Sequence, residues 1–190
     1  MNTPDPVGSL SHALDAYAPA KIAERIATAG VAKATLPLLP LFTLAVLAGA
    51  FIAFGAIFYL AVMYQFGPAP GAGKLVGGVV FSLGLLLIVV GGAELFTGNN
   101  LIILARCDGL IGTGAMLRNW SVVYAGNFAG AAATAVLVSL SGILGPETGA
   151  FAEQVRNVAG AKIALPWEQA FVRGILCNTL VCLAVWLCFA

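Results

Sequence analysis

The stretch GGAELFTGNNL, residues 91–101, lies inside an apolar segment that runs from Leu75 to Ala105. From residue 75 to residue 105 this segment has 31 residues, more than the roughly 20 that one upright membrane span needs. Gly frees the backbone and Thr and Asn compete for its hydrogen bonds, so the cluster predicts a break near residues 97–100. Non-helical backbone at membrane depth needs a cover of protein or a water-filled cavity, so a broken helix indicates a permeation or binding site. The alternative is a helix that ends near Phe96, with residues 97–105 as an interfacial turn.

The composition around this stretch is that of an integral membrane protein. Of the 190 residues, 61% are apolar and 9% are charged, and the mean hydropathy is +0.99. A soluble domain carries about a quarter charged residues, and a globule of this size cannot bury so much apolar surface. The net charge of +1 leaves no basic face for nucleic acid. We expect no enzyme, metal site or cofactor, because the spans hold no catalytic or metal-ligating constellation and the single histidine, His12, is remote from them.

Four uncharged stretches have the length of membrane spans. They lie at about 39–64, 75–105 (broken near 97–100), 119–146 and 167–190, and a polar loop precedes the last one. Before them, Ala, Leu and Ile alternate with charged residues in a pattern typical of an amphipathic helix, interrupted near Pro19. We therefore expect an amphipathic segment at 1–35 and a transmembrane domain at 36–190.

Lysine and arginine in the short flanks favour a cytoplasmic N-terminus. Five such residues lie on the side of the N-terminus and three on the other side, namely Lys21, Arg25, Lys33, Arg106 and Arg118 against Lys74, Arg156 and Lys162. The four cysteines, at 107, 177, 182 and 188, match neither a zinc motif nor a disulfide framework. Glycines 126 and 130 have the Gly-x-x-x-Gly spacing that lets helix backbones approach, which indicates a tightly packed bundle or oligomer.

Four polar side chains in or near the spans are candidates for function. Glu94 adjoins the core of a span, where it is either a functional or paired carboxylate, or a cap on the broken backbone at the water boundary. The Thr97 hydroxyl either serves a ligand or bonds back to its own helix. Lys162, in the loop before the last span, either draws anions toward a pore mouth or is simply solvated. The Asn178 amide is expected to bond a neighbouring helix.

Several blocks of the sequence resemble the formate/nitrite transporter family, in the family's order, over roughly residues 15–190. The blocks are GKLVGG at 73–78, FSLGL at 81–85, GAELFTGN at 92–99, RNW at 118–120, YAGNFAG at 124–130, GILCN at 174–178 and LVCLAVW at 180–186. The resemblance implies an aquaporin-like bundle of six membrane segments in two inverted halves, assembled as a homopentamer with one pore per protomer. Four of the six segments are present, without the family's pore histidine, so we expect either a longer chain or a complementary piece.

The resemblance also implies which side chains line the pore. The second segment of the family breaks at a Leu-Phe-Thr motif, and an inner constriction forms there from residues that match Leu85, Leu95, Phe96, Thr97 and Val181. Phe81 matches the aromatic residue of an outer constriction. Lys162 matches a lysine of the outer vestibule, and Asn178 matches the amide of the fourth segment. We expect Asn178, together with Glu94 beside the second span, to be a polar support of the pore.

The function that the resemblance implies is a channel or transporter for small monovalent anions in the bacterial inner membrane. Formate is the first expectation, with proton coupling, because a bare charge crosses apolar constrictions at high cost. Nitrite, acetate, lactate and hydrosulfide are alternatives within the family. A water or glycerol channel is disfavoured because no Asn-Pro dipeptide occurs. A non-transporting membrane scaffold or fragment is the alternative from another class, and it should be indifferent to substitution of Thr97 and Lys162.

Overall fold

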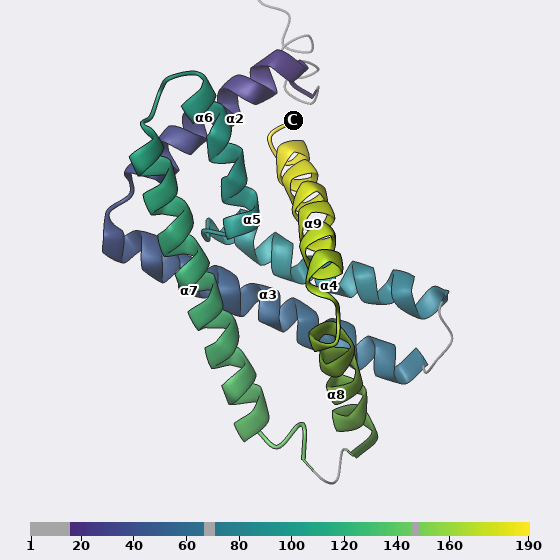
Figure 1. The fold of residues 1–190 in the computed structure, drawn as a ribbon. Helices are drawn as coiled ribbons and strands as arrows, with labels where there is room; N and C mark the ends of the chain where they lie inside the picture. The colour runs from purple at the N-terminus through teal and green to yellow at the C-terminus, as the bar shows by residue number, and fades with distance from the viewer. Residues whose placement is uncertain (1–15, 67–70, 146–148) are drawn as a thin grey trace, which may run out of the picture.

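The structure, a computed structural model, describes residues 16–66, 71–145 and 149–190. Within these ranges all regular structure is helical (Figure 1). The elements are α2 (Pro19–Thr35), α3 (Leu38–Phe66), α4 (Ala72–Gly91), α5 (Phe96–Asn99), η1 (Asn100–Ile102), α6 (Ile103–Cys107), α7 (Thr113–Leu140), α8 (Gly149–Ile163) and α9 (Trp167–Leu187).

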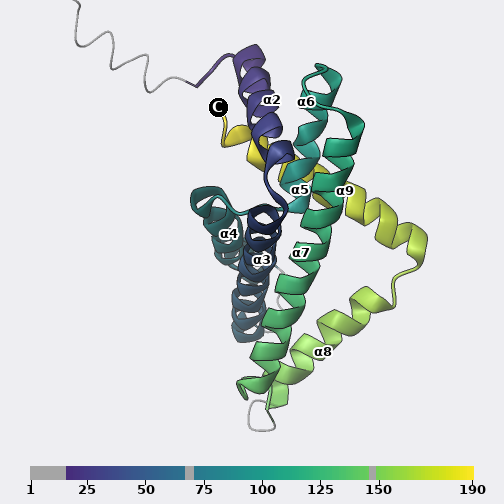
Figure 2. The ribbon, with the colours of Figure 1, turned by 90° about the vertical axis from the view of Figure 1, so that its left-hand side faces the viewer.

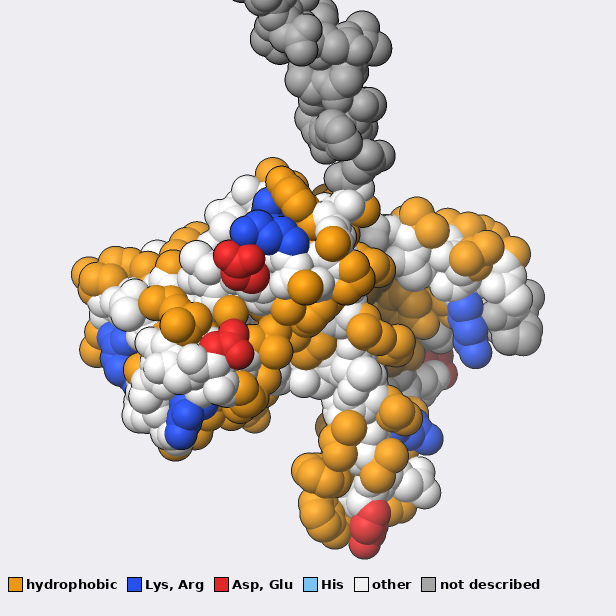
Figure 3. All heavy atoms as spheres, turned by 90° about the horizontal axis from the view of Figure 1, so that it is seen from above, with side chains coloured by type: hydrophobic (Ala, Val, Ile, Leu, Met, Phe, Trp, Pro, Cys, Tyr) orange, Lys and Arg blue, Asp and Glu red, His pale blue; other side chains and the backbone are white. Residues whose placement is uncertain are grey.

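Four of these helices, α3, α4, α7 and α9, are long and apolar enough to cross a membrane. Large hydrophobic side chains are exposed along all four, among them Phe58, Leu86, Leu140 and Leu180. Figure 3, which views the molecule from above, shows hydrophobic side chains over much of the surface and charged side chains at only a few places. Such a surface is stable in lipid and not in water. The predicted fold class, an all-α membrane protein with a broken second span, is confirmed.

Among the described helices, α3 and α7 pack closely on one another; they cross in Figure 1 and lie next to each other in Figure 2. Leu41, Ala45 and Val123 are fully buried there. A Cβ on Gly130 would collide with the Val46 carbonyl of α3, and a Cβ on Gly49 would collide with the Asn127 backbone of α7. The glycine spacing therefore serves a contact between two helices of one chain, where backbone touches backbone.

The break in the second span lies earlier than the sequence pattern indicates. Helix α4 ends at Gly91, Gly92 adopts the left-handed φ of 67°, and helical structure resumes at Phe96. Residues 97–100 stay helical because the Asn99 side chain bonds other side chains and does not compete for its own backbone. The alternative of an interfacial turn is wrong, since residues 96–107 continue through α5, η1 and α6.

One further segment differs from expectation. The predicted polar loop before the last span is mostly helix α8, because Phe151, Ala152 and Val155 recur at helical spacing and give it an apolar face toward α3. Helix α2 begins at Pro19, where proline fits the first turn of a helix, and residues 16–18 before it are not helical. The amphipathic pattern before residue 16 lies outside the described residues.

Candidate functional site

The broken backbone after α4 is held by one side chain of α7, the Asn127 amide. Its Oδ1 accepts the Phe96 N–H at 2.8 Å, and its Nδ2 donates to the carbonyls of Glu94 at 2.9 Å and Ala45 at 2.8 Å. The Glu94 N–H donates to the Leu44 carbonyl at 3.2 Å. Asn127 thus supplies hydrogen bonds that the interrupted helix does not make, which is the protein cover that non-helical backbone requires at this depth.

Next to this break, a buried polar cluster joins α2, the break and α7; we call it the Glu94 cluster. It consists of Lys33, Glu94, Asn99 and Asn119. Lys33 Nζ lies 2.6 Å from Glu94 Oε1, and Asn99 Nδ2 donates to Glu94 Oε2 at 2.7 Å and to Asn119 Oδ1 at 2.9 Å. Asn119 Nδ2 donates to the Lys33 carbonyl at 3.0 Å. Glu94, only 4% exposed, is therefore a paired carboxylate, while the capping role belongs to Asn127.

Thr97 on α5 and Asn178 on α9 both contact Cys182, at the place where α5 packs against α9. Thr97 Oγ1 and Asn178 Oδ1 are both buried and have no hydrogen-bond partner among the described residues. The two residues are linked through Cys182, whose thiol donates to the Thr97 carbonyl at 3.2 Å and lies 3.9 Å from Asn178 Nδ2. Within the described residues, neither the bond from Thr97 to its own helix, one of its two alternatives, nor the expected bond from Asn178 to a neighbouring helix is formed. Two unpaired polar atoms at one junction are uncommon in folded proteins.

A cavity of about 1160 Å³ lies between α3, α4, α8 and α9; we call it the outer cavity after the outer vestibule that the family resemblance implies for Lys162. Phe81 and Lys162, which the sequence singles out separately, both line it, and Lys162 stands in the last turn of α8. Lys74 and Arg173 also line this cavity, and the described part of its wall contains no aspartate or glutamate. Three cations without an opposing acid attract anions and raise their local concentration.

A second cavity, of about 520 Å³, lies on the other side of the break, beside the Glu94 cluster. Leu95 lines it together with Lys33, Glu94 and Val185. Between the two cavities, Leu85 on α4 and Val181 on α9 are half-buried. The Phe96 ring packs on Tyr124, with 5.4 Å between the ring centroids, and on the α3–α7 core.

Sequence reasoning missed Lys33, Asn99, Asn119 and Asn127 as parts of the site. Asn99, Asn119 and Asn127 stand inside blocks that the family resemblance uses, and this position was the available signal for all three. Lys33 lies outside those blocks and precedes Glu94 by 61 residues, so no local pattern joins the two. Across the described ranges, no group of three or more His, Cys, Asp or Glu side chains could hold a metal ion.

Comparison with known sequences identifies relatives of this chain. The family model described as Formate/nitrite transporter matches residues 20–190. The chain is 42% identical over 177 residues to the formate channel FocA of Escherichia coli (strain K12), covering 93% of this chain and 62% of that protein. It is 44% identical over 144 residues to FocA of Haemophilus influenzae, covering 75% of this chain and 51% of that protein.

Solved structures agree with the sequence comparison. A pentameric formate channel with formate bound superposes with a TM-score of 0.72 at 37% identity, covering 78% of this chain and 59% of that one. An ion channel of the FNT family superposes with a TM-score of 0.74 at 30% identity, covering 88% and 67%. The chain spans less than two thirds of the length of the two FocA relatives. With its apolar helices, broken second span and family match, this multi-pass membrane chain belongs to the formate/nitrite transporter family.

Proposed function

We propose that the protein conducts small monovalent anions, formate first and nitrite second, across the bacterial inner membrane. The observation that carries this proposal is the outer cavity, whose described wall holds Lys74, Lys162 and Arg173 without a carboxylate. The names of the FocA relatives and the pentameric formate channel support formate and a homopentamer. The lysine and arginine distribution supports a cytoplasmic N-terminus, with residues 1–35 as an inner amphipathic segment and 36–190 as the transmembrane domain.

The route that we propose begins at the three cations and passes Phe81 toward the half-buried Leu85 and Val181. A bare anion crosses such an apolar stretch at high cost, whereas the neutral acid crosses at much lower cost. The unpaired Thr97 hydroxyl can donate to the anion, and the unpaired Asn178 Oδ1 can accept from the protonated acid. Together with Leu95 on the inner side, these groups would form the constriction, with Glu94 holding the break in shape.

Charge removal at the outer cavity should slow uptake. At low ionic strength, Lys162→Gln is expected to reduce formate uptake into proteoliposomes by about tenfold, and added salt should shrink the difference. Lys21→Gln is the matched control, because Lys21 is exposed on α2 and paired with Glu24 away from both cavities. If the protein is a non-transporting scaffold, there is no formate uptake for either variant to change. Equal uptake rates for Lys162→Gln and the parent protein would contradict the assignment of the outer cavity to anion attraction.

Removal of the Thr97 hydroxyl tests the constriction separately. Thr97→Val keeps the shape of the side chain and is expected to slow uptake by about tenfold through the loss of one hydrogen bond. In the parent protein, uptake should rise as the outside pH falls from about 8 to about 5, because the neutral acid becomes more abundant. A pH-independent flux, or unchanged flux in Thr97→Val, argues against a protonated species at Thr97.

Cys177 reports on the electrostatics of the outer cavity, because its thiol lines the same wall as the three cations. The experiment uses a variant in which Cys107, Cys182 and Cys188 are replaced by serine, so that Cys177 is the remaining thiol. An anionic methanethiosulfonate reagent should modify Cys177 about tenfold faster than a cationic one at low salt. Lys162→Gln should reduce that ratio. Faster reaction with the cationic reagent contradicts an anion-attracting cavity.

A further inference from the structure

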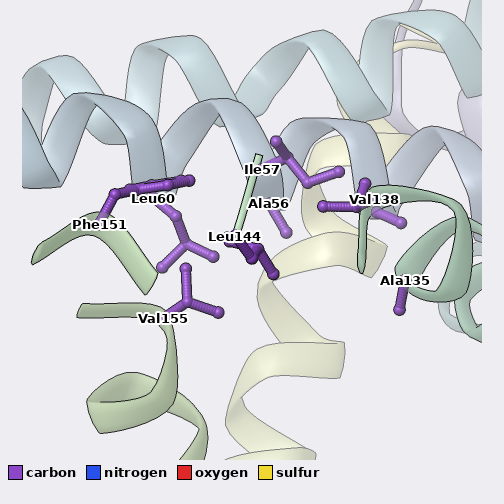
Figure 4. Close-up of a pocket in the computed structure, with 9 residues that line it drawn as sticks. Ala56, Ile57, Leu60, Ala135, Val138, Leu144, Phe151 and Val155 are labelled. Atoms are coloured by element: carbon purple, nitrogen blue, oxygen red, sulfur yellow. The ribbon is translucent and has the colours of Figure 1, made fainter. Parts of the chain in front are cut away.

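A separate apolar pocket of about 210 Å³ lies between α3, α7 and α8. It adjoins the outer cavity at Ala56 and Leu60 and contains none of that cavity's charged residues. Figure 4 shows hydrocarbon side chains from three helices and one loop converging on it. The lining residues are Ala53, Ala56, Ile57, Leu60, Ala135, Val138, Leu144, Phe151 and Val155.

The wall of this pocket is built by packing between elements. The rings of Tyr64 on α3 and Phe151 on α8 meet edge to face, with centroids 5.6 Å apart. Ala152, next to Phe151, is 3% exposed. These contacts hold α8 against α3 while leaving the space between Leu60, Val138 and Val155 unfilled by the described residues.

The chemistry of the wall selects a hydrocarbon occupant. A cavity of about 150 Å³ lined by Leu, Ile and Phe stays dry and accepts benzene. The present pocket is larger and equally free of polar side chains, so water has no partners in it. It is formed by α3 and α7, two helices that qualify as membrane spans, near the α7 end at Leu140. The hydrocarbon available there is a lipid acyl chain.

Charged groups next to the pocket complement a phospholipid headgroup. Arg156 directly follows the lining residue Val155, and Glu153 stands one helical turn before Arg156. Both side chains are exposed, and neither forms a hydrogen bond or ion pair with any residue that the structure describes. A long arginine side chain can lie along apolar surface and bring its guanidinium to the lipid headgroups.

We propose that this pocket binds one acyl chain of a zwitterionic phospholipid. Arg156 would hold the phosphate and Glu153 the ammonium of a phosphatidylethanolamine headgroup. The bound lipid would fill the gap between α7 and α8 and thereby brace the wall of the adjoining outer cavity. This inference concerns the membrane surface of the protein, so it stands whether or not formate is the transported anion.

Photo-crosslinking tests the proposal on the protein in phosphatidylethanolamine vesicles. The probe is phosphatidylethanolamine with a diazirine at the end of one acyl chain, and labelled peptides are located by mass spectrometry. We expect label on the segments that contain Ala135–Leu144 and Phe151–Val155. Ala135→Trp fills the pocket and should reduce this label to background. Val136→Trp is the matched control, because Val136 is 57% exposed and does not line the pocket.

A surface variant provides a second test, which does not depend on correct folding of Ala135→Trp. Arg156→Gln should lower the labelling by about fivefold, whereas Asn157→Ala, on the neighbouring exposed position, should leave it unchanged. Equal labelling of the parent protein and Ala135→Trp would overturn the pocket assignment. Crosslinks between two protein chains at these segments would show that a second copy of the chain, and not a lipid, occupies the pocket. Equal labelling by a phosphatidylglycerol probe would overturn the headgroup assignment.

Discussion

Lys33→Met is expected to destabilise the fold by about 3–5 kcal/mol, because it leaves the Glu94 carboxylate buried without its cation. The Glu94 side chain is 5% exposed and that of Lys33 is 32% exposed, so the carboxylate depends more on the pair than the ammonium does. Glu94→Gln should therefore cost less, about 1–2 kcal/mol, since the amide keeps part of the hydrogen bonding and Lys33 can reach water. The free energy of unfolding is measured by titration with sodium dodecyl sulfate in mixed micelles.

The double variant and a surface pair provide the controls for this prediction. Lys33→Met combined with Glu94→Gln should recover part of the loss, because no buried charge remains. Lys21→Met breaks the Lys21–Glu24 pair, whose side chains are 54% and 64% exposed, and should change stability by no more than about 0.5 kcal/mol. If Lys33→Met and Lys21→Met cost the same, the buried pair does not stabilise the break.

Gly130→Ala is expected to lower the free energy of unfolding by about 3 kcal/mol or more and to abolish formate uptake. A Cβ at this position would meet the backbone of Val46, which cannot rotate away as a side chain can. The α7 helix would have to move from α3, and Asn127, one turn before Gly130, would lose its bonds to the Phe96 N–H and the Ala45 carbonyl. Gly49→Ala, on the opposite side of the same contact, should have a similar effect.

The matched control for this prediction is Gly160→Ala in α8, where a Cβ meets nothing within 4 Å and which lines neither cavity. Alanine is favoured over glycine in a helix by up to about 1 kcal/mol, so this variant should be neutral or slightly more stable. Unfolding in mixed micelles and formate uptake are measured for all three variants. Wild-type stability of Gly130→Ala would show that α3 and α7 can separate without loss, against the contact described here.

The sequence predicts the membrane helices and the presence of a break because both depend on local composition. It places the break too late, because the polar residues at 97–100 look like helix breakers until their partners are known. Asn99 is satisfied by Glu94 and Asn119, and the left-handed turn falls instead at Gly92. The family resemblance names Phe81 and Lys162 separately, and only the fold shows that they line one cavity.

The partners of Glu94 illustrate what lies beyond a single sequence. An acidic residue beside a span could be one partner of an ion pair, a functional carboxylate or a cap on the broken backbone. Each of these roles depends on residues from other elements. The cation comes from α2, and the capping amide comes from α7. Neither distance along the chain nor periodicity predicts these contacts, because they form only when α2 and α7 pack around the break.

Helix α9 has a consequence for how the protein is made. None of its 21 residues is buried by the described part of the chain, whereas α3, α4 and α7 each bury several. A helix this apolar can leave the translocon for lipid through its own hydrophobicity, without waiting for helical partners. Its docking then relies on a few groups that recognise α5, above all the Cys182 thiol at the Thr97 carbonyl. The composition and contacts of α9 therefore predict that its insertion depends on lipid and its docking on a short polar contact.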